Sequence, residues 1–212
     1  MRNRTDHGGA VIEFALIAPF LTSLIIGTLI YGTQLVKELE LQQVARDTGS
    51  MAARGTNFNN AANQAIVSRL GQELNWPNTG GLTSTSSGVV YVSTIKYLDA
   101  TCNTGGTPCA NHDHWVFVKS VAFGNTTMRQ SNFGAPPSCV PGCYDATQND
   151  GSINSSDILT NGGDVVQSFT YLGTPNSNNT GFQPGQPAFL VEVAGKTGPW
   201  NGGVPSYAFS LF

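Results

Sequence analysis

Charged side chains are scarce in this chain of 212 residues. Lysine, arginine, aspartate and glutamate together make up 11% of it, against about 25% in an ordinary globular domain. The 10 basic residues form no stripe that could neutralise phosphates, which excludes a nucleic-acid binder. Hydrophobic residues still make up 40%, so a charge-driven disordered chain is excluded too. Neutral Gly, Asn, Ser and Thr must therefore keep the surface soluble, which suits an exported protein.

Motifs of catalysis are also missing. The sequence has no Gly-x-Ser-x-Gly nucleophile elbow and no Gly-x-x-x-x-Gly-Lys phosphate loop. Of its 3 histidines, two form the sequence His112-Asp113-His114 in a Gly- and Asn-rich stretch, where such side chains are more often solvated than bound to a metal. We therefore expect no enzyme, no catalytic residue and no nucleic-acid partner.

Cysteine is rare, and all of it lies beyond residue 100. The four cysteines are Cys102, Cys109, Cys139 and Cys143. Four cysteines allow three disulfide connectivities, between which spacing does not choose. We favour the two local pairs, because short loops bring thiols together often. The alternative is a zinc site that combines Cys109 with His112 and His114, but the Cys-x-x-Cys spacing of zinc sites is absent. Disulfides would place this part of the chain outside the cytoplasm.

One long apolar run lies near the amino terminus. Residues 10–36 carry a single charge, Glu13, and they exceed the roughly 20 residues that a helix needs to cross a bilayer. The run is too long for a signal peptide, and Arg2 and Arg4 before it should stay in the cytoplasm. A plain membrane anchor explains all of this except Glu13, because a carboxylate in a membrane helix costs about 2.5–3.5 kcal/mol at the centre and less near the end.

The residues around that acid resemble a type IV prepilin processing site. The sequence Gly8-Gly9-Ala10-Val11-Ile12-Glu13-Phe14 has the Gly, the four following residues, the Glu and the aromatic residue of that motif. The resemblance implies that a membrane prepilin peptidase cuts after Gly8, so that Gly9 becomes the first residue. It also implies that Glu13 then pairs with the amino group of a neighbouring subunit's first residue.

The resemblance extends to TadE-like proteins, the minor pilins or pseudopilins of tight-adherence pilus systems. Residues 9–20 (GAVIEFALIAPF) are similar to the start of those proteins, and residues 45–55 (ARDTGSMAARG) to the end of their helix. The match covers roughly the first quarter of the chain. It implies a subunit of a homo-oligomeric filament, assembled by pilus machinery in the inner membrane. Residues 31–34 are neutral where the family often has an acid and an Arg, which leaves open whether the subunit is minor or major.

The apolar run should belong to a longer helix. Residues 10–54 contain no strong helix breaker except Pro19, and as a helix they would be about 67 Å long. Pro19 should kink or locally melt this helix, and Gly55 is a reasonable stop. Beyond the membrane, an apolar stripe recurs every three or four residues and should pack on the chain's own globular domain. The stripe consists of Leu41, Val44, Ala45, Thr48, Met51 and Ala52.

The remainder predicts an α+β domain. An amphipathic helix over residues 58–75, capped by Asn57 or Asn59, should end at Trp76-Pro77. Short β-branched and aromatic runs then predict an antiparallel sheet of four or five strands with disulfide-stapled loops. These runs are Val89–Leu98, Trp115–Phe123, Val165–Leu172, Ala188–Ala194 and Tyr207–Phe212. We divide the chain into a leader (1–8), a transmembrane and assembly helix (9–55) and an exported domain (56–212).

One loop resembles a calcium-binding loop of the EF-hand or dockerin type. In residues 149–159 (NDGSINSSDIL), Gly151 would make the sharp turn at position six. The candidate ligands at positions five, nine and twelve are Asp150, Asn154 and Asp157. Positions one and three fall on Ala146 and Gln148, where the pattern has acids or amides. Calcium is the cofactor that this loop suggests, and a plain polar turn is the alternative.

Three functions follow from these features. The first is a pilin subunit, cut after Gly8 and assembled through its helix into a surface filament, with an outward β domain for adhesion. The second is a single-pass anchored extracellular binding protein that never assembles. An anchored hydrolase is the least favoured of the three, because the motifs of catalysis are missing.

Overall fold

The computed structural model describes residues 7–134, 136, 144–145, 147–169, 183–197 and 204–212. The chain has two compact units, Met1–Lys37 and Glu38–Phe212. The second unit combines helices with an antiparallel sheet, which confirms the predicted α+β class.

The first helix, α1, spans His7–Ala53 and has 47 residues. It is helical through Pro19, so the local melting that we predicted there does not occur. Next to the proline, the hydroxyl groups of Thr22 and Ser23 donate hydrogen bonds to the carbonyls of Ala18 and Pro19, each over 2.8 Å. A hydroxyl that bonds to the preceding turn needs no other partner, which suits a helix in an apolar environment.

The end of α1 is set by Gly55, as predicted. Gly55 has a φ of +80°, its N–H donates to the carbonyl of Ala52 over 2.9 Å, and the N–H of Thr56 donates to the carbonyl of Met51 over 3.1 Å. These two bonds form a Schellman motif, which satisfies the last carbonyls of a helix and favours glycine at the left-handed position. The chain can therefore turn back at this point.

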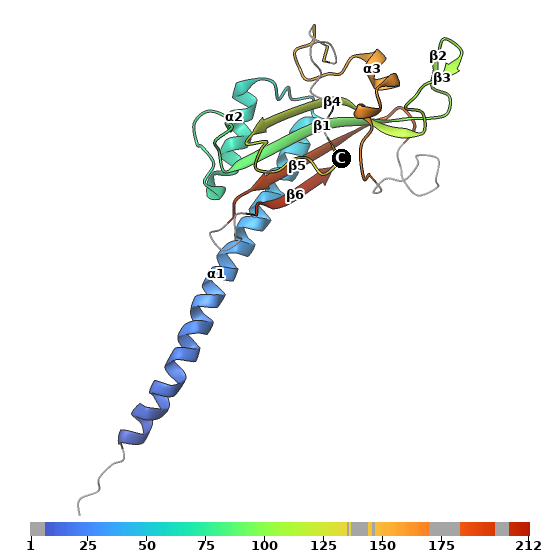
Figure 1. Ribbon diagram of the computed structural model, residues 1–212. Coiled ribbons are helices and arrows are strands. Elements are labelled where there is room, and N and C mark those ends of the chain that lie inside the picture. The colour runs from blue at the N-terminus through green and yellow to red at the C-terminus, as the bar shows by residue number, and fades with distance from the viewer. Residues whose placement is uncertain (1–6, 135, 137–143, 146, 170–182, 198–203) are drawn as a thin grey trace, which may run out of the picture. The chain divides into compact units, whose positions relative to one another are not determined.

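Four strands form one antiparallel sheet in the order β4-β1-β5-β6 (Figure 1). The strands are β1 (Gly88–Leu98), β4 (His114–Gly124), β5 (Pro187–Gly195) and β6 (Ser206–Leu211). They confirm four of the five predicted runs. The fifth, Val165–Leu172, is wrong over the residues that the structure describes. Val165 makes only an isolated bridge to Val116, and Ser168 has a φ of +52°, which an extended strand does not tolerate.

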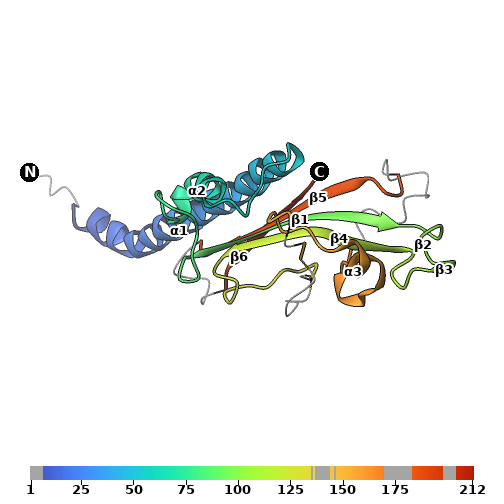
Figure 2. The same cartoon turned by 90° about the horizontal axis from the view of Figure 1, so that it is seen from above.

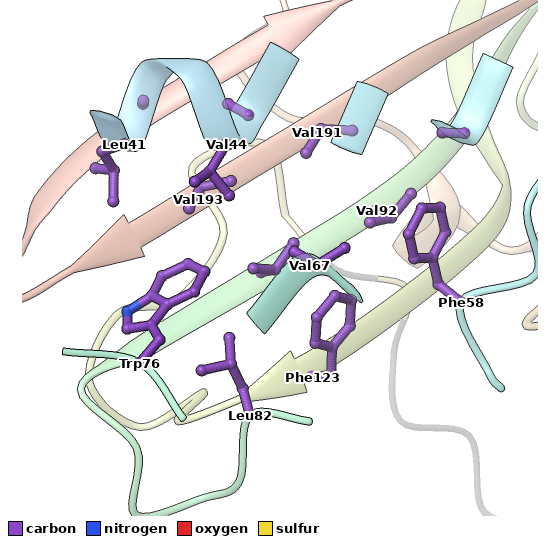
Figure 3. Close-up of a cluster of buried hydrophobic side chains, with 14 of the residues drawn as sticks. Leu41, Val44, Phe58, Val67, Trp76, Leu82, Val92, Phe123, Val191 and Val193 are labelled. Atoms are coloured by element: carbon purple, nitrogen blue, oxygen red, sulfur yellow. The ribbon is translucent and has the colours of Figure 1, made fainter. Parts of the chain in front are cut away.

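The last turns of α1 and the second helix, α2 (Ala61–Leu70), cover one face of the sheet (Figure 2). The predicted stripe on α1 is buried there: Leu41, Val44, Ala45 and Thr48 are at most 1% exposed. Their partners project from the strands and from the segment after α1, and Figure 3 shows how these side chains meet. They include Phe58, Val67, Trp76, Leu82, Val92, Phe123, Val191 and Val193. The stripe thus packs on the chain's own domain, as predicted.

The second helix begins later than we predicted. Asn60, rather than Asn57 or Asn59, is the cap, because its side chain accepts the N–H of Ala62 over 2.9 Å. The Asn57 side chain instead accepts the N–H of Asn59 in the turn before the helix. A 3₁₀ turn, η1 (Gln72–Leu74), follows α2, so helical structure ends just before Trp76-Pro77 as expected.

The other face of the sheet is covered by the connection between β4 and β5. This connection includes a short helix, α3 (Ser155–Thr160), which lies on the side of the sheet opposite α2 (Figure 2), and a 3₁₀ turn, η2 (Gly162–Asp164). A second apolar cluster lies here, made of Ile95, Tyr97, Trp115, Phe117, Phe133, Ile153, Val166, Ala188 and Leu190. Because both faces are covered, β1 is buried along nearly its whole length.

The indole of Trp76 fits between glycines. A Cβ on Gly71 would lie 2.2 Å from the Trp76 ring, and one on Gly88 would lie 2.3 Å from it. The tryptophan is only 3% exposed. Two glycines that are distant in sequence therefore leave room for the indole of Trp76, which packs between the end of α2 and the start of β1.

We predict that Gly88→Ala destabilises the domain by about 1–3 kcal/mol, because overpacking forces the indole or the strand to move. Urea unfolding of the full chain, followed by tryptophan fluorescence, measures this. The control is Gly162→Ala, whose Cβ would meet no atom within 4 Å and which should leave stability nearly unchanged. Equal stability of the Gly88 variant and the parent would contradict the prediction.

Candidate functional site

The predicted processing residues lie in the first turns of α1. Gly8, Gly9, Glu13 and Phe14 are all helical, and Glu13 and Phe14 are exposed. Gly9 and Glu13 are four residues apart, so they lie on one side of the helix, about one turn from each other. The structure therefore brings Glu13 close to the residue that would become the new amino terminus.

The same part of α1 carries a large exposed apolar surface. The side chains of Val11, Ile12, Phe14, Leu16, Phe20 and Leu24 are each more than 60% exposed. By length and composition this helix could cross a membrane. Side chains of this kind are not left to water in a stable protein, so a bilayer or the helices of neighbouring subunits must cover them.

A comparison with known families supports this interpretation. Residues 8–54 match the model of the family described as TadE-like protein. The match covers 47 of the 212 residues, under a quarter of the chain. No curated protein and no solved structure matches the chain. Together, the TadE-like match and the apolar helix indicate a membrane-anchored, pilus-associated protein.

The TadE-like match follows the helix and stops there. It begins one residue after the first residue of α1 and ends at Arg54, just before Gly55. The four strands of the sheet and the Cys102–Cys109 disulfide lie outside the match, whereas the turns of α1 that cover one face of the sheet lie inside it. The match therefore concerns α1 alone, and any binding role of the sheet must be inferred from its own residues.

One of the two predicted disulfides is confirmed. Cys102 and Cys109 are bonded, with their Cα atoms 5.6 Å apart. They close a two-stranded hairpin, β2 (Asn103–Thr104) and β3 (Thr107–Pro108), whose turn Gly105-Gly106 has positive φ at both residues. The zinc alternative is wrong for Cys109, because a disulfide sulfur is not a thiolate ligand. Cys139 and Cys143 lie outside the described residues.

The predicted calcium ligands occupy a segment that docks on the edge of β4. Gly151 has a φ of +85°, as a sharp turn requires, and its carbonyl accepts the N–H of Ser120 over 2.9 Å. The N–H of Ile153 donates over 2.8 Å to the carbonyl of Val118, at the β-bulge where the register of β1 and β4 shifts. The loop thus has a structural role, because its backbone extends the hydrogen bonding of β4.

The carboxylate of Asp150 already has a cationic partner. Lys119 Nζ lies 2.7 Å from Asp150 Oδ2, and Oδ1 accepts both the N–H and the hydroxyl of Ser152. Burial disfavours the charged form of Asp150, but these hydrogen bonds outweigh it and hold the pKa of Asp150 below its ordinary value. A calcium ion at this oxygen would have to displace the lysine.

The other two candidate ligands lie further along. Asn154 precedes α3 and Asp157 is in its first turn. Among the residues that the structure describes, no three His, Cys, Asp or Glu side chains are grouped as metal ligands. Amide and backbone oxygens also bind calcium, so calcium binding by Asp150, Asn154 and Asp157 stays a prediction, which calorimetric titration of the full chain with calcium tests.

Asp164 is a buried acid that the sequence pattern does not reveal. It is 0% exposed, and neither carboxylate oxygen has a hydrogen-bond partner in the described part of the chain. Burial, with a smaller contribution from the charge of Asp157, raises the pKa of Asp164 to about 6. The side chain is therefore neutral in mildly acidic solution and carries an unfavourable buried charge above that range.

This acid makes stability depend on pH. A group whose pKa rises from 3.8 in the unfolded chain to about 6 in the fold favours the fold below pH 4 and loses that contribution as the pH rises through 6. We predict that the unfolding free energy falls by about 1–3 kcal/mol between pH 4 and pH 7 through Asp164. Urea unfolding at a series of pH values measures this.

The variant Asp164→Asn should lose that pH dependence and be more stable than the parent at pH 7.5. Asp157→Asn should shift the fall to lower pH, because it removes the nearby negative charge. The exposed Asp113 provides the control, and Asp113→Asn should leave the profile unchanged. A profile of Asp164→Asn that overlays the parent's would contradict the assignment.

Glu192 is a second buried acid, but a fully partnered one. It is 2% exposed in the middle of β5 and accepts hydrogen bonds from the Ser131 hydroxyl, from the N–H of Asn132 over 2.8 Å and from the Tyr207 hydroxyl over 2.7 Å. Burial raises the pKa of Glu192, and these donors partly offset the rise. The sequence does carry a signal for this buried acid, because Glu192 is the lone charge in the apolar run Phe189-Leu190-Val191-Glu192-Val193.

Proposed function

We propose that the chain is a pilin subunit, processed by a prepilin peptidase after Gly8 and assembled through α1 into a surface filament. The TadE-like match over residues 8–54 supports this, and so does the exposed apolar surface of α1. The observation that carries the proposal is Glu13, which lies one turn from Gly9 on a helix otherwise suited to hydrocarbon.

The peptidase step fits the residues at the cut. A protease binds its substrate extended, so the first turn of α1 must unwind in the cleft. Gly8 and Gly9 permit this better than other residues, because glycine is a poor helix former. The cut leaves a positive amino group on Gly9, at the end of the helix where the macrodipole is also positive. That amino group needs a negative partner within a few ångströms.

Glu13 is the acid that can fill this need. In the isolated subunit its carboxylate lies one turn from the amino group of the same chain. In the filament, the carboxylate pairs with the amino group of a neighbouring subunit, which removes two charges from an apolar helix bundle at once. This pairing sets the register between subunits, because only one offset brings the two charges together.

The chain has its place in the inner membrane before assembly and on the cell surface afterwards. Its partners are other pilin subunits, the prepilin peptidase and the pilus assembly machinery of the inner membrane. The sheet domain is outward and serves adhesion. The competing function is an anchored binding protein that never assembles, and processing separates the two.

Mass spectrometry of the mature protein tests the processing. We predict a chain that begins at Gly9, and an uncut precursor for Gly8→Val, because a β-branched side chain beside the scissile bond does not fit a site built for glycine. Gly27→Val, a matched change inside the helix, should leave the cut in place. An intact Met1 in the parent, or a cut near residue 33, would contradict the pilin proposal.

A substitution of Glu13 tests assembly. We predict that Glu13→Leu still inserts in the membrane, since it removes a charge from an apolar segment, but forms filaments at less than a tenth of the parent level. Alkaline extraction measures insertion, and electron microscopy of sheared cell-surface material measures filaments. Glu38→Leu is the control and should assemble. Normal filaments from the Glu13 variant would remove the reason for the proposed pairing.

A further inference from the structure

A cavity of about 290 Å³ opens on the face of the sheet that lies opposite α2. It is lined by Asn132, Phe133, Ser168, Tyr207 and Phe209. Two of these, Tyr207 and Phe209, are alternate residues of β6 and so project from the same face of the strand. The others come from the connection between β4 and β5. Residues distant in the sequence therefore form one cup on the second unit.

The walls of this cup are mainly aromatic. Phe133 meets Phe209 edge-to-face with ring centroids 5.5 Å apart, and Tyr207 lies 6.2 Å from Phe209 at a tilt of 30°. Phe209 is 37% exposed, although it is a large apolar side chain on a strand. Exposed aromatic rings that are fixed in place are typical of a binding surface.

Buried polar contacts hold the cup in shape. Glu192 lies behind it and receives hydrogen bonds from the hydroxyl of Tyr207 and the backbone N–H of Asn132. The guanidinium of Arg129 stacks on the Tyr207 ring, 4.3 Å from its centroid. The tyrosine is thus fixed at its hydroxyl and on one face. A site that is rigid before binding loses little entropy when a ligand enters.

The charge of the site selects a neutral ligand. No charged side chain lines the cavity among the residues described. The two charges behind the wall, Glu192 and Arg129, have opposite sign and lie near each other. Neither an anion nor a cation would gain a free counter-charge on entry, and both would lose hydration.

Two residues of the lining carry polar groups that could bond to a ligand. Asn132 Oδ1 accepts a hydrogen bond from Arg129 Nη2 over 3.0 Å, which leaves the amide N–H groups of Asn132 as donors. The Ser168 hydroxyl makes no hydrogen bond in the described part of the chain, and this residue is held at a φ of +52°. A strained backbone beside a pocket is typical of a residue positioned for binding.

We propose that this cup binds one ring of a neutral carbohydrate. The C–H face of a sugar packs on Tyr207 and Phe209. One sugar hydroxyl accepts a hydrogen bond from the Asn132 amide, and another donates to or accepts from the Ser168 hydroxyl. The volume suits a single sugar unit. The inference rests on the proposed function in one respect only, that this domain faces outward and meets glycans there.

Saturation-transfer NMR on the full chain tests the proposal, in a detergent without a sugar headgroup. The probes are glucose, galactose, mannose and N-acetylglucosamine, each at millimolar concentration. We expect saturation of the ring protons of at least one sugar. Asn132→Asp keeps the oxygen that Arg129 contacts but removes the amide donor, and Ser168→Gly removes the hydroxyl but accepts the positive φ. Each should weaken binding at least tenfold.

The control is Ser155→Ala, at the start of α3, which should bind as the parent does. Tryptophan fluorescence confirms that each variant is folded. No saturation of any of the four sugars by the parent would overturn the proposal, and so would unchanged binding by both folded site variants. Displacement of a bound sugar by a proline-rich peptide at lower concentration would also overturn it in favour of a peptide site. These results are independent of the cut after Gly8, which mass spectrometry reports.

Discussion

The packing of the last turns of α1 on the sheet is the contact on which the second unit depends. One helical stripe, from Leu41 to Ala52, buries the strands on that side. Even Thr48 is fully buried in it, with a hydroxyl that has no hydrogen-bond partner in the described residues. That orphan hydroxyl is a cost, which the surrounding apolar burial must exceed. The sheet could not keep this face in water without the helix.

The opposite face is organised by polar groups as well as by apolar ones. Glu192 and Asp164 are both buried there, but they differ in what surrounds them. Three donors converge on Glu192, so its charge is compensated and its position is fixed. No donor among the described residues bonds to Asp164, and its neighbour Asp157 adds a like charge. Glu192 therefore fixes the wall of the cup, whereas Asp164 makes the stability of this face depend on pH.

The sequence predicts the parts of this fold that depend on local patterns. The apolar stripe of α1, the stop at Gly55 and four strands follow from period and turn chemistry. The run at Val165 has the composition of a strand, but Ser168 takes a left-handed conformation and breaks it. The Cys102–Cys109 pair follows from the short sequence separation of the two cysteines. The hairpin that the Gly105-Gly106 turn forms between them is not among the predicted elements.

The features that escaped prediction depend on contacts between distant residues. Glu192 is partnered by Ser131 and Tyr207, from two other segments, and no window along the chain contains all three. The slot for Trp76 likewise needs Gly88, from the next element. The processing residues were predicted from a resemblance, because a motif read by a peptidase must be contiguous in sequence.

The position of the confirmed disulfide bears on the order in which parts of the second unit form. Cys102 and Cys109 close only the tip of a hairpin, whose strand residues are exposed. None of the residues that pack between α1 and the sheet lies within that loop. The core between α1 and the sheet can therefore form without this disulfide. We therefore expect oxidation of this pair to fix the tip of the hairpin and not to be required for the sheet.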